Sequence, residues 1–495
     1  KKGKEEVAGV RSEPMESRED IRKYLDAQAN TANTPLSSRA FAEHMDAIDP
    51  IRDGRTQFFV PSMKDLGVRD TDSGDADGEC VYLCGNSLGL QPRAARALVN
   101  EELDKWSKKG VNGHFEGERP WVSIDDNVTP LVAEIVGALP HEVAVMNSLT
   151  VNLQLIMTTF YEPTQERHKV LMEAQAFGSD WHAVASHVEL NGYDPHESIM
   201  SPEMDKDGLH TTAAWLSLLD REGESISVVL IGAVQYLTGQ FFDDIPTITQ
   251  KAHEKGVRVL LDCAHAVGNV PLCLHDWQVD AAIWCHYKYC NAGPGAIGGY
   301  FIHEKHTNSD TVAAASFVNG HQRNKGDSKI FQPRRLAGWW GADLSTRFSM
   351  RHEFISATGA AGFRLSNPPV LETVALLASL RIHTQYGMQA LRGKSLLLTG
   401  YLEHLLETML QSHVHILTPR EPNRRGCQLS LAFPSLPPST PFERLFKTLA
   451  DKGVVVDHRE PNVIRVAPTP LYNSFADVWR FVDILAQALG VQCEQ

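Results

Sequence analysis

The sequence predicts an α/β fold, with a large domain built on a mostly parallel sheet and a smaller α+β domain at the C-terminus. From about residue 93, short apolar runs alternate with helical stretches, and this alternation is typical of a parallel sheet covered on both faces. After about residue 346 the pattern changes to two long helical stretches followed by strand-like runs. A chain of 495 residues with 42% apolar content can bury the core that such a fold needs.

The expected elements follow from the spacing of apolar residues. Pro92 precedes a helix with an apolar face, and short apolar or β-branched runs then follow as strands. The strands are expected at 143–146, 170–172, 228–231, 257–261, 281–285 and 300–302. In the smaller domain, helices are expected at 369–384 and 388–409, and strands at 428–432, 454–456 and 463–466.

Composition and charge argue against several classes of function. The formal net charge is −14 and no stripe of Lys and Arg is present, so nucleic-acid binding is not expected. No membrane span is expected, because the sequence has no run of about 18 apolar residues. The first residues are polar with no apolar signal segment behind them, which favours a cytoplasmic location. Cys80 and Cys84 have no second pair at ligand spacing, so no metal site is expected.

The segment 257–299 carries the clearest chemical signal. Asp262 ends one predicted strand, and Lys288 lies just after another. Ligands of open α/β sheets bind outside the carboxyl ends of the strands, so both side chains should face one crevice. A lysine there can form a Schiff base with pyridoxal phosphate, while a carboxylate keeps the pyridine nitrogen protonated. Alone, Lys288 would be a surface residue and Asp262 a turn residue; together they favour this cofactor.

Two more segments fit the same cofactor. Leu149 and Thr150 open a helix directly after a strand, where free N–H groups can hold a phosphate, although an ordinary helix cap is the alternative. Phe177 follows another strand and can stack on the pyridine ring, or it can belong to the core. His265 can support the Asp262 carboxylate or simply fill the core.

Several segments, taken together, resemble kynureninase. They are CGNSLGLQP (84–92), NSLTVNLQLIMTTFY (147–161), the long segment 262–306, GWWGADLSTRFSM (338–350), GFRLSNPP (362–369) and IRVAPTPLYNSF (464–475). These segments occur in order from about residue 80 to the C-terminus, and it is their combination that is specific.

The resemblance implies an enzyme of the aspartate-aminotransferase-like fold type that depends on pyridoxal 5'-phosphate. It implies hydrolysis of the Cβ–Cγ bond of L-kynurenine or 3-hydroxy-L-kynurenine. The products would be anthranilate or 3-hydroxyanthranilate and L-alanine, in tryptophan catabolism and NAD biosynthesis. It also implies a homodimer whose active site is shared between the subunits.

Residue roles carry over by position. Lys288 would be the Schiff-base lysine, and Tyr287 would contact the phosphate and relay protons. The implied cofactor-binding residues are Leu149, Thr150, Phe177, Gly178, Ser179, Asp180, Gly232, Asp262, His265, Tyr287, Lys288, Trp339 and Asn367. The implied substrate-binding residues are Ser87, His114, Asn367 and Arg465. Trp339 and Asn367 would come from the partner subunit, and Arg465 would pair with the substrate carboxylate. One position departs from the family, because Gly232 stands where kynureninases carry a serine.

Four regions are expected along the chain. They are a flexible N-terminal arm at 1–35, a segment at 36–92 that contributes to the small domain and the active-site entrance, a large cofactor-binding domain at 93–345, and a small C-terminal domain at 346–495. The acidic stretch at 69–79 is expected to be a solvated loop.

Three other functions remain open at the level of the sequence. A cysteine desulfurase or selenocysteine lyase shares the fold and the Asp–Lys pair but needs a mobile nucleophilic cysteine. Cys427 has basic neighbours and is the candidate, although it opens a strand-like run. An aminotransferase would exchange keto acids instead of hydrolysing a bond. A catalytically silent scaffold is disfavoured by the intact set of Asp262, Lys288 and Arg465.

Overall fold

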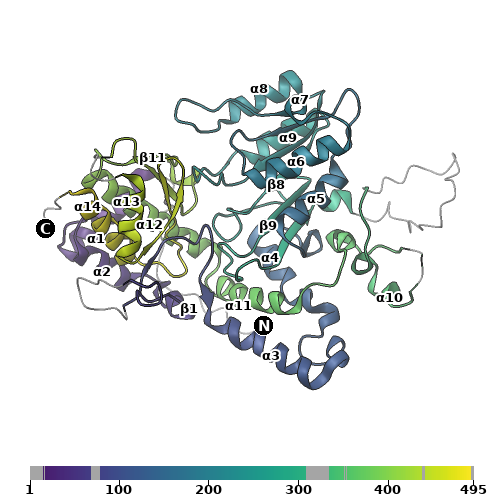
Figure 1. Ribbon diagram of the computed structural model, residues 1–495, viewed down its shortest axis with the longest axis horizontal. Helices are drawn as coiled ribbons and strands as arrows, with labels where there is room; N and C mark the ends of the chain where they lie inside the picture. The colour runs from purple at the N-terminus through teal and green to yellow at the C-terminus, as the bar shows by residue number, and fades with distance from the viewer. Residues whose placement is uncertain are drawn as a thin grey trace.

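The computed structural model describes residues 15, 17–68, 78–307, 334–350, 352, 354–436 and 441–491. A large body built around a sheet lies beside a smaller body that contains segments from both ends of the chain, in purple and in yellow (Figure 1). The first 14 residues of the expected arm and residues 69–77 of the expected acidic loop lie outside the described residues.

The large body contains a mixed, mostly parallel sheet with the strand order β4-β10-β9-β8-β7-β5-β6. Its strands are β4 (Val143–Val145), β5 (Lys169–Met172), β6 (Ile199–Met200), β7 (Ile226–Gly232), β8 (Arg258–Asp262), β9 (Ala281–Cys285) and β10 (Gly298–Ile302). Neighbouring strands from β9 to β6 pair in parallel, whereas β10 is antiparallel to both β9 and β4. β4 therefore points the same way as the parallel strands. The predicted α/β fold is confirmed, and only the short β6 was missed in this sheet.

Both faces of this sheet are buried, which explains the continuous apolar runs of the sequence. In β8, Val259 and Leu261 belong to one core cluster and Leu260 belongs to another, as the alternation of a strand requires. Helices α4, α8, α9 and α11 contribute to the first cluster, and α5 and α6 contribute to the second. Helices of this body are α3 (Arg93–Lys109), α4 (Thr129–Val136), α5 (Leu149–Phe160), α6 (Gly178–Leu190), α7 (Pro195–Ser198), α8 (Thr212–Glu222), α9 (Ile245–Glu254), α10 (Leu344–Arg347) and α11 (Val370–Tyr386).

The smaller body packs helices against a sheet of order β11-β12-β15-β14, in agreement with the expected α+β domain. Its strands are β11 (His415–Ile416), β12 (Leu429–Ala432), β14 (Asp457–Arg459) and β15 (Val463–Val466). Its helices are α1 (Arg18–Ala32), α2 (Arg39–Ile48), α12 (Met388–Met409), α13 (Phe442–Asp451) and α14 (Phe475–Leu489). Two short sheets tie the N-terminal segment to the rest: β1 (Phe58–Phe59) pairs with β3 (Gln91–Pro92), and β2 (Val81–Tyr82) pairs with β13 (Val454–Val455).

Two expectations about the domains need correction. The loose arm at 1–35 is wrong for α1, because a Ser17–Asp20 capping box starts this helix and Ile21 and Leu25 are buried in the core of the smaller body. The boundary before residue 346 also differs, because α11 packs against α3 in the core of the large body. In the C-terminal part of the chain, residues contribute to the core of the smaller body only from α12 onward.

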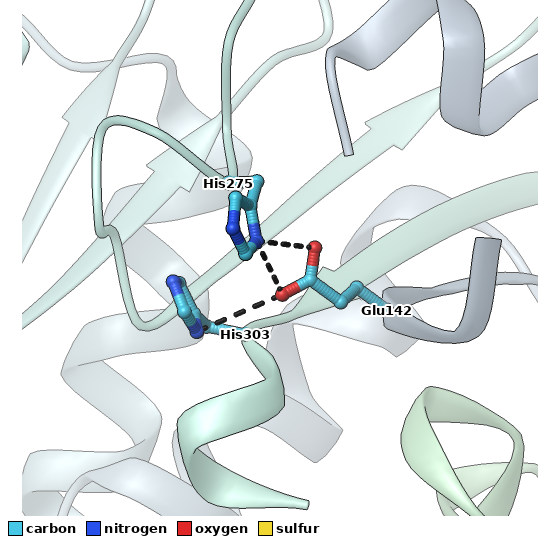
Figure 2. Close-up of side chains that lie close together, drawn as sticks. All are labelled: Glu142, His275 and His303. Carbon is cyan, nitrogen blue, oxygen red and sulfur yellow. Dashed lines mark hydrogen bonds and ion pairs between the residues drawn. The ribbon is translucent and has the colours of Figure 1, made fainter. Parts of the chain in front are cut away.

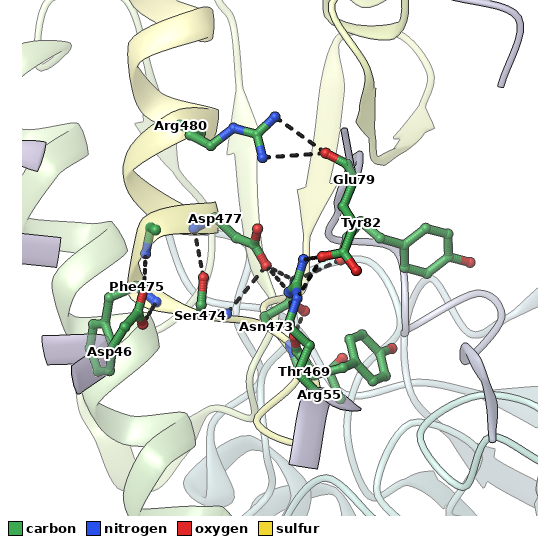
Figure 3. Close-up of polar contacts among 12 residues, drawn as sticks. Asp46, Arg55, Glu79, Tyr82, Thr469, Asn473, Ser474, Phe475, Asp477 and Arg480 are labelled. Atoms are coloured by element: carbon green, nitrogen blue, oxygen red, sulfur yellow. Dashed lines mark hydrogen bonds and ion pairs between the residues drawn. The ribbon is translucent and has the colours of Figure 1, made fainter. Parts of the chain in front are cut away.

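An ion-pair junction joins the N-terminal segment to α14 (Figure 3). Arg55 donates to an oxygen of Asp477 at 2.7 Å and to Glu79 Oε2 at 2.8 Å. Asp477 is also the third residue of α14, where it completes a capping box with Ser474. Asp46 of α2 accepts the N–H groups of Phe475 and Ala476 at the same helix end. The start of α14 is therefore held by two segments from the N-terminal part of the chain.

A search of the described residues for a helix long and apolar enough to cross a membrane finds none.

We expect Asp477→Ala to lower the free energy of unfolding by about 3 kcal/mol, because it removes the buried partner of Arg55 together with half of a capping box. Urea unfolding followed by circular dichroism measures this loss. The matched control is Asp451→Ala, which breaks an exposed pair with Lys447 on α13 and should cost no more than about 0.5 kcal/mol. Similar losses in the two variants would contradict a structural role for the junction.

Candidate active site

The carboxyl ends of the parallel strands converge on one cavity. Segments that follow β4, β5, β7, β8 and β9 contribute its lining. The predicted site residues in this lining are Leu149, Thr150, Phe177, Ser179, Asp180, Gly232, Asp262, His265, Tyr287 and Lys288. Residues that are far apart in the sequence are thus gathered where the topology of the sheet places ligands.

Asp262 and Lys288 come from neighbouring strands. Asp262 is the last residue of β8, and Lys288 follows the end of β9. These two strands are hydrogen-bonded, and Asp262 lies opposite Ile283 of β9. Paired strands lie about 4.8 Å apart, so the two side chains leave the sheet from adjacent positions. The N–H of Ala264 donates to Asp262 Oδ1 at 2.7 Å, which fixes the orientation of the carboxylate.

Two helix N-termini meet on the other side of the cavity. α5 begins at Leu149 and α6 at Gly178, and neither helix has a side-chain hydrogen bond from its N-cap residue. The hydroxyls of Thr150 and Ser179 lie 2.8 Å apart and join the two helix ends. Free N–H groups, aligned helix dipoles and hydroxyl donors make this place suited to a phosphate.

An aromatic side chain stands at the mouth of the cavity. Phe177 is 47% exposed, and its ring contacts that of Tyr236 edge-on with 5.2 Å between centroids. A partly exposed phenyl ring at this position can cover a flat ligand. Gly178, which was expected beside it, lines a neighbouring cavity between α6 and α7. A Cβ on Gly178 would meet no atom within 4 Å, so its backbone has open space around it.

The floor of the cavity holds three acidic side chains, of which Glu173 and Asp180 are buried. Burial raises the pKa of Glu173 to about 8; the N–H of Gly232, which donates at 3.0 Å, opposes this rise and the charge of Asp262 adds to it. The pKa of Asp180 lies well above its usual value, because the carboxyl is buried and Asp262 is next to it. Burial thus shifts Glu173 and Asp180 toward their neutral forms, next to the carboxylate of Asp262.

His265 lies beside these acids as an uncharged imidazole. Burial and the positive charges of Lys288, Arg465 and Arg459 hold the pKa of His265 well below its usual value. Its Nδ1 and the Oδ1 of Asp180 are buried and have no hydrogen-bond partner among the described residues. Buried polar atoms nearly always have a partner, so these two atoms are suited to a ligand that fills the cavity.

A second polar group, next to the cavity, surrounds Arg465 on β15. Its guanidinium donates to Asp457 Oδ1 at 2.8 Å, to the carbonyl of Tyr236 at 2.7 Å and to Ser87 Oγ at 3.3 Å. Ser87 in turn donates to Asp457 Oδ2 at 2.6 Å. Because Tyr236 lines the cavity, this group adjoins the Lys288 site and brings two predicted substrate-binding residues, Ser87 and Arg465, together.

The segment that carries Ser87 passes against the loop of Lys288. The N–H of Gly89 donates to the carbonyl of Tyr287 at 2.8 Å. A Cβ on Gly89 would lie 2.3 Å from the carbonyl oxygen of Lys288 and 2.2 Å from Asn291 Oδ1. Only glycine allows this approach, so the glycine of the NSLGL sequence is required by packing.

Three other predicted site residues line neither this cavity nor the neighbouring one, and they do not belong to the polar group at Arg465. His114 ends a 3₁₀ helix after α3, where its ring packs against Trp121 and Phe115. Trp339 is 49% exposed and donates from its indole nitrogen to the carbonyl of Arg347. Asn367 is exposed in the loop before α11. The single chain therefore does not bring these three side chains to Lys288.

Sequence reasoning missed Glu173, Tyr236 and Asp457. Glu173 directly follows β5, so the rule that parallel strand ends line the ligand site could have identified it. Asp457 lies opposite Arg465 across β14 and β15, and the sequence offered no means of finding it because β14 was not predicted.

Glu142, His275 and His303 form the one cluster with metal-ligand geometry found among the described residues (Figure 2). His275 Nδ1 lies 3.0 Å from Glu142 Oε1, and His303 Nδ1 lies 3.6 Å from the same oxygen. The carboxylate also accepts the N–H groups of Leu139 and Glu304, and His303 Nδ1 accepts the N–H of Lys305. The atoms that could bind a metal already have hydrogen-bond partners within the protein. The cluster therefore joins three segments of the chain through buried hydrogen bonds.

The residues around Lys288 fit pyridoxal phosphate. An amine for the aldehyde, a carboxylate for the ring nitrogen, an aromatic ring and a phosphate cradle all line one cavity. Asp180 and His265, which carry the unpartnered atoms, line the same cavity as Asp262.

Comparisons with known proteins agree with this geometry. The model of the kynureninase C-terminal domain matches residues 391–485, and that of class-V aminotransferases matches residues 81–310. The kynureninase of Monosiga brevicollis is 46% identical and covers 92% of this chain and 97% of its own. That of Mus musculus is 43% identical and covers 96% and 98%, respectively.

Solved structures with a similar fold are much more distant in sequence. The cystine C–S lyase C-DES has a TM-score of 0.63 at 17% identity, with 86% of this chain and 100% of that chain covered. A cysteine desulfurase from Thermococcus onnurineus has a TM-score of 0.61 at 15% identity, with 83% and 95% covered. These likenesses show the fold, whereas the close relatives decide the family. The chain belongs to the kynureninase family.

Proposed function

We propose that this protein is a pyridoxal-phosphate-dependent hydrolase that cleaves L-kynurenine or 3-hydroxy-L-kynurenine and releases L-alanine. The observation that carries the proposal is the cavity that combines Lys288, Asp262 and two helix N-termini, with Arg465 beside it. The close relatives that define the family are kynureninases along nearly their whole length. When bound, pyridoxal phosphate supplies an aldehyde for the substrate amine and a ring that accepts electrons.

Lys288 and Asp262 have the central roles. Lys288 would hold the cofactor through its amine, and its free amine would be the base for the proton on the substrate Cα. Asp262 would hold the ring nitrogen and favour its protonated form. Leu149, Thr150 and Ser179 would hold the phosphate at the ends of α5 and α6, and Phe177 would cover the ring.

The substrate side follows from the polar group at Arg465. Arg465 would bind the substrate carboxylate, and Ser87, which accepts a hydrogen bond from Arg465, would contact the aromatic part of the substrate. Tyr287 lines the cavity, and burial raises the pKa of its hydroxyl, so it stays protonated and can donate to the phosphate or relay a proton. Gly232 lines the cavity, where its N–H donates to Glu173.

The alternative of a cysteine desulfurase lacks a suitable nucleophile. Cys427 is fully buried, and burial raises its pKa to about 12, so its thiol is protonated at neutral pH and enclosed. Within the described residues, Cys273 is the exposed cysteine, and it is not among the residues that line the cavity.

We also propose a homodimer in the cytoplasm in which each subunit completes the other's site. Trp339 and Asn367 are exposed and do not reach the cavity of their own chain. Trp339 packs edge-on against Phe348, which contacts Phe115, and all three rings are exposed. An exposed aromatic group of this kind is typical of an interface, and a second copy would bring Asn367, Trp339 and His114 to a neighbouring cavity.

The purified protein loaded with pyridoxal phosphate is expected to convert L-kynurenine to anthranilate and alanine in equal amounts. Lys288→Ala should reduce turnover at least about a thousandfold and abolish the visible absorbance of the lysine-linked cofactor, because Lys288 supplies the amine among the described residues that line the cavity. Fluorescence of anthranilate and an alanine assay in the same tube measure both. Lys206→Ala, which changes an exposed lysine, is the control. Normal cofactor binding without either product would reject the proposed reaction.

The shared site predicts complementation between two inactive variants. Lys288→Ala and Asn367→Ala are each expected to be nearly inactive, but subunit exchange should restore about a quarter of the wild-type activity, because about half of all dimers are then mixed and each mixed dimer contains one intact site out of two. The mixture is measured against each variant alone and against a mixture of Lys288→Ala with Lys288→Met. Activity that stays at the level of the separate variants would mean that each chain forms its own site.

The raised pKa of Glu173 predicts how the stability of the cofactor-free protein depends on pH. Its pKa is raised in the folded state, so the fold binds more protons than the unfolded chain between about pH 4.5 and pH 8, and its contribution to stability falls as the pH rises through this range. In Glu173→Gln the side chain stays neutral. The melting temperature of this variant relative to wild type should therefore increase from about pH 5 to about pH 8. The exposed Glu189→Gln should show no such trend.

A further inference from the structure

The guanidinium of Arg465 is already engaged in the absence of substrate. Its side chain is 2% exposed, and both Nε and Nη2 lie 2.8 Å from the carboxylate of Asp457. Nη2 also donates to Ser87, and Nη1 donates to the carbonyl of Tyr236. A carboxylate that binds an arginine through two parallel N–H bonds needs two free donors on one edge. No edge of Arg465 offers two free donors, so a substrate carboxylate has to replace an existing partner.

Asp457 is the partner of Arg465 that has a second possible partner, Arg459, close by. It lies on β14, opposite Arg465 in register, at the edge of the four-stranded sheet. Its Oδ1 is also 3.2 Å from Nη1 of Arg459, a side chain that is 37% exposed on the same strand. The carbonyl of Tyr236, in contrast, is a fixed backbone group. A small rotation of the Asp457 side chain would exchange Arg465 for Arg459 without moving a strand.

The charges of this group favour the same exchange. Arg465 and Arg459 carry two positive charges against the one negative charge of Asp457, so the group has one positive charge in excess. One incoming carboxylate neutralises it. Burial alone would raise the pKa of Asp457, but the hydrogen bond and charge of Arg465 outweigh this and hold it below its usual value, so the competitor stays charged at neutral pH. Burial lowers the pKa of His265 in the cavity, and the charges of Lys288, Arg465 and Arg459 lower it further. The two arginines of this group therefore act electrostatically on a residue that lines the cavity.

We propose that Asp457 is a positioning residue that occupies Arg465 until the carboxylate of an α-amino acid replaces it, with Arg459 then taking over Asp457. Asp457 keeps the guanidinium extended toward the cavity, and it sets the affinity for the carboxylate by competing with it. This rests on the proposed role of Arg465 in binding the substrate. Asp457 is not among the residues that line the Lys288 cavity, so we place its effect at its two partners, Arg465 and Ser87.

The test compares an acid with its amide in the cofactor-loaded enzyme. L-alanine and L-alaninamide are titrated by calorimetry into wild type, Asp457→Asn and Arg459→Gln. Asn keeps an acceptor for Nε but removes the competing charge, so L-alanine should bind about tenfold more tightly. Arg459→Gln removes the alternative partner of Asp457, so L-alanine should bind several-fold more weakly. L-alaninamide has no carboxylate, and its affinity should change in neither variant.

The affinity for L-alanine is expected to change in opposite directions in Asp457→Asn and Arg459→Gln, and this difference separates the proposed role from a structural one. His458→Gln on the same strand is the matched control, since this exposed side chain contacts Phe446 and makes no contact with the group around Arg465. Weaker binding of L-alanine in both Asp457→Asn and Arg459→Gln, equal changes for the acid and the amide, or no binding to wild type would each overturn the proposal. Turnover of L-kynurenine is measured separately, so that a failure of the proposed reaction is distinguished from a failure of the exchange.

Discussion

The pairing of β8 with β9 is the constraint on which the rest of the site depends. It places Asp262, at the end of one strand, next to the segment that carries Lys288 after the other. Every other part of the site is arranged around this pair by a strand that points the same way. β4 delivers the start of α5, β5 delivers Glu173, and β7 delivers Gly232. β10 runs in the opposite direction and delivers no residue to the cavity.

The acidic side chains of the cavity have to be considered together with the positive charges near them. Three carboxyl groups lie close to one another, and burial forces two of them toward the neutral form. A site in which all three were charged would cost far more than Lys288 and the distant arginines could offset, because unpaired buried charge is expensive. The neutral acids still matter, because they hold the backbone of Gly232 and flank Asp262.

The sequence was most informative where function depends on local order. Strand ends, the helix start at Leu149 and the Asp262–Lys288 pair could be predicted, because each is set by a short segment and by the general rule for parallel sheets. Asp457 could not be predicted in this way, since its importance comes from a cross-strand register within a strand of three residues. α1 was missed for a different reason: a capping box and two buried residues outweighed its charged composition. Trp339, Asn367 and His114 lie outside the cavity of their own chain, so for these three residues the structure of one chain adds no support to the role that the resemblance implies.

The loop after β7 connects the cofactor side to the carboxylate side. The carbonyl of Tyr236 accepts from Arg465 and also from Gln428 of the smaller body, and the carbonyl of Leu237 accepts from Ser430. Farther along, Thr418 donates to the carbonyl of Thr238 at 2.6 Å. The smaller body is therefore attached to the large one through the same few backbone groups that position Arg465. Any shift of the smaller body has to move the guanidinium relative to Lys288, so this loop sets the distance between Arg465 and Lys288. That arrangement explains why the segment with Ser87 and Gly89 packs so tightly on the Lys288 loop, because it closes the same junction from the other side.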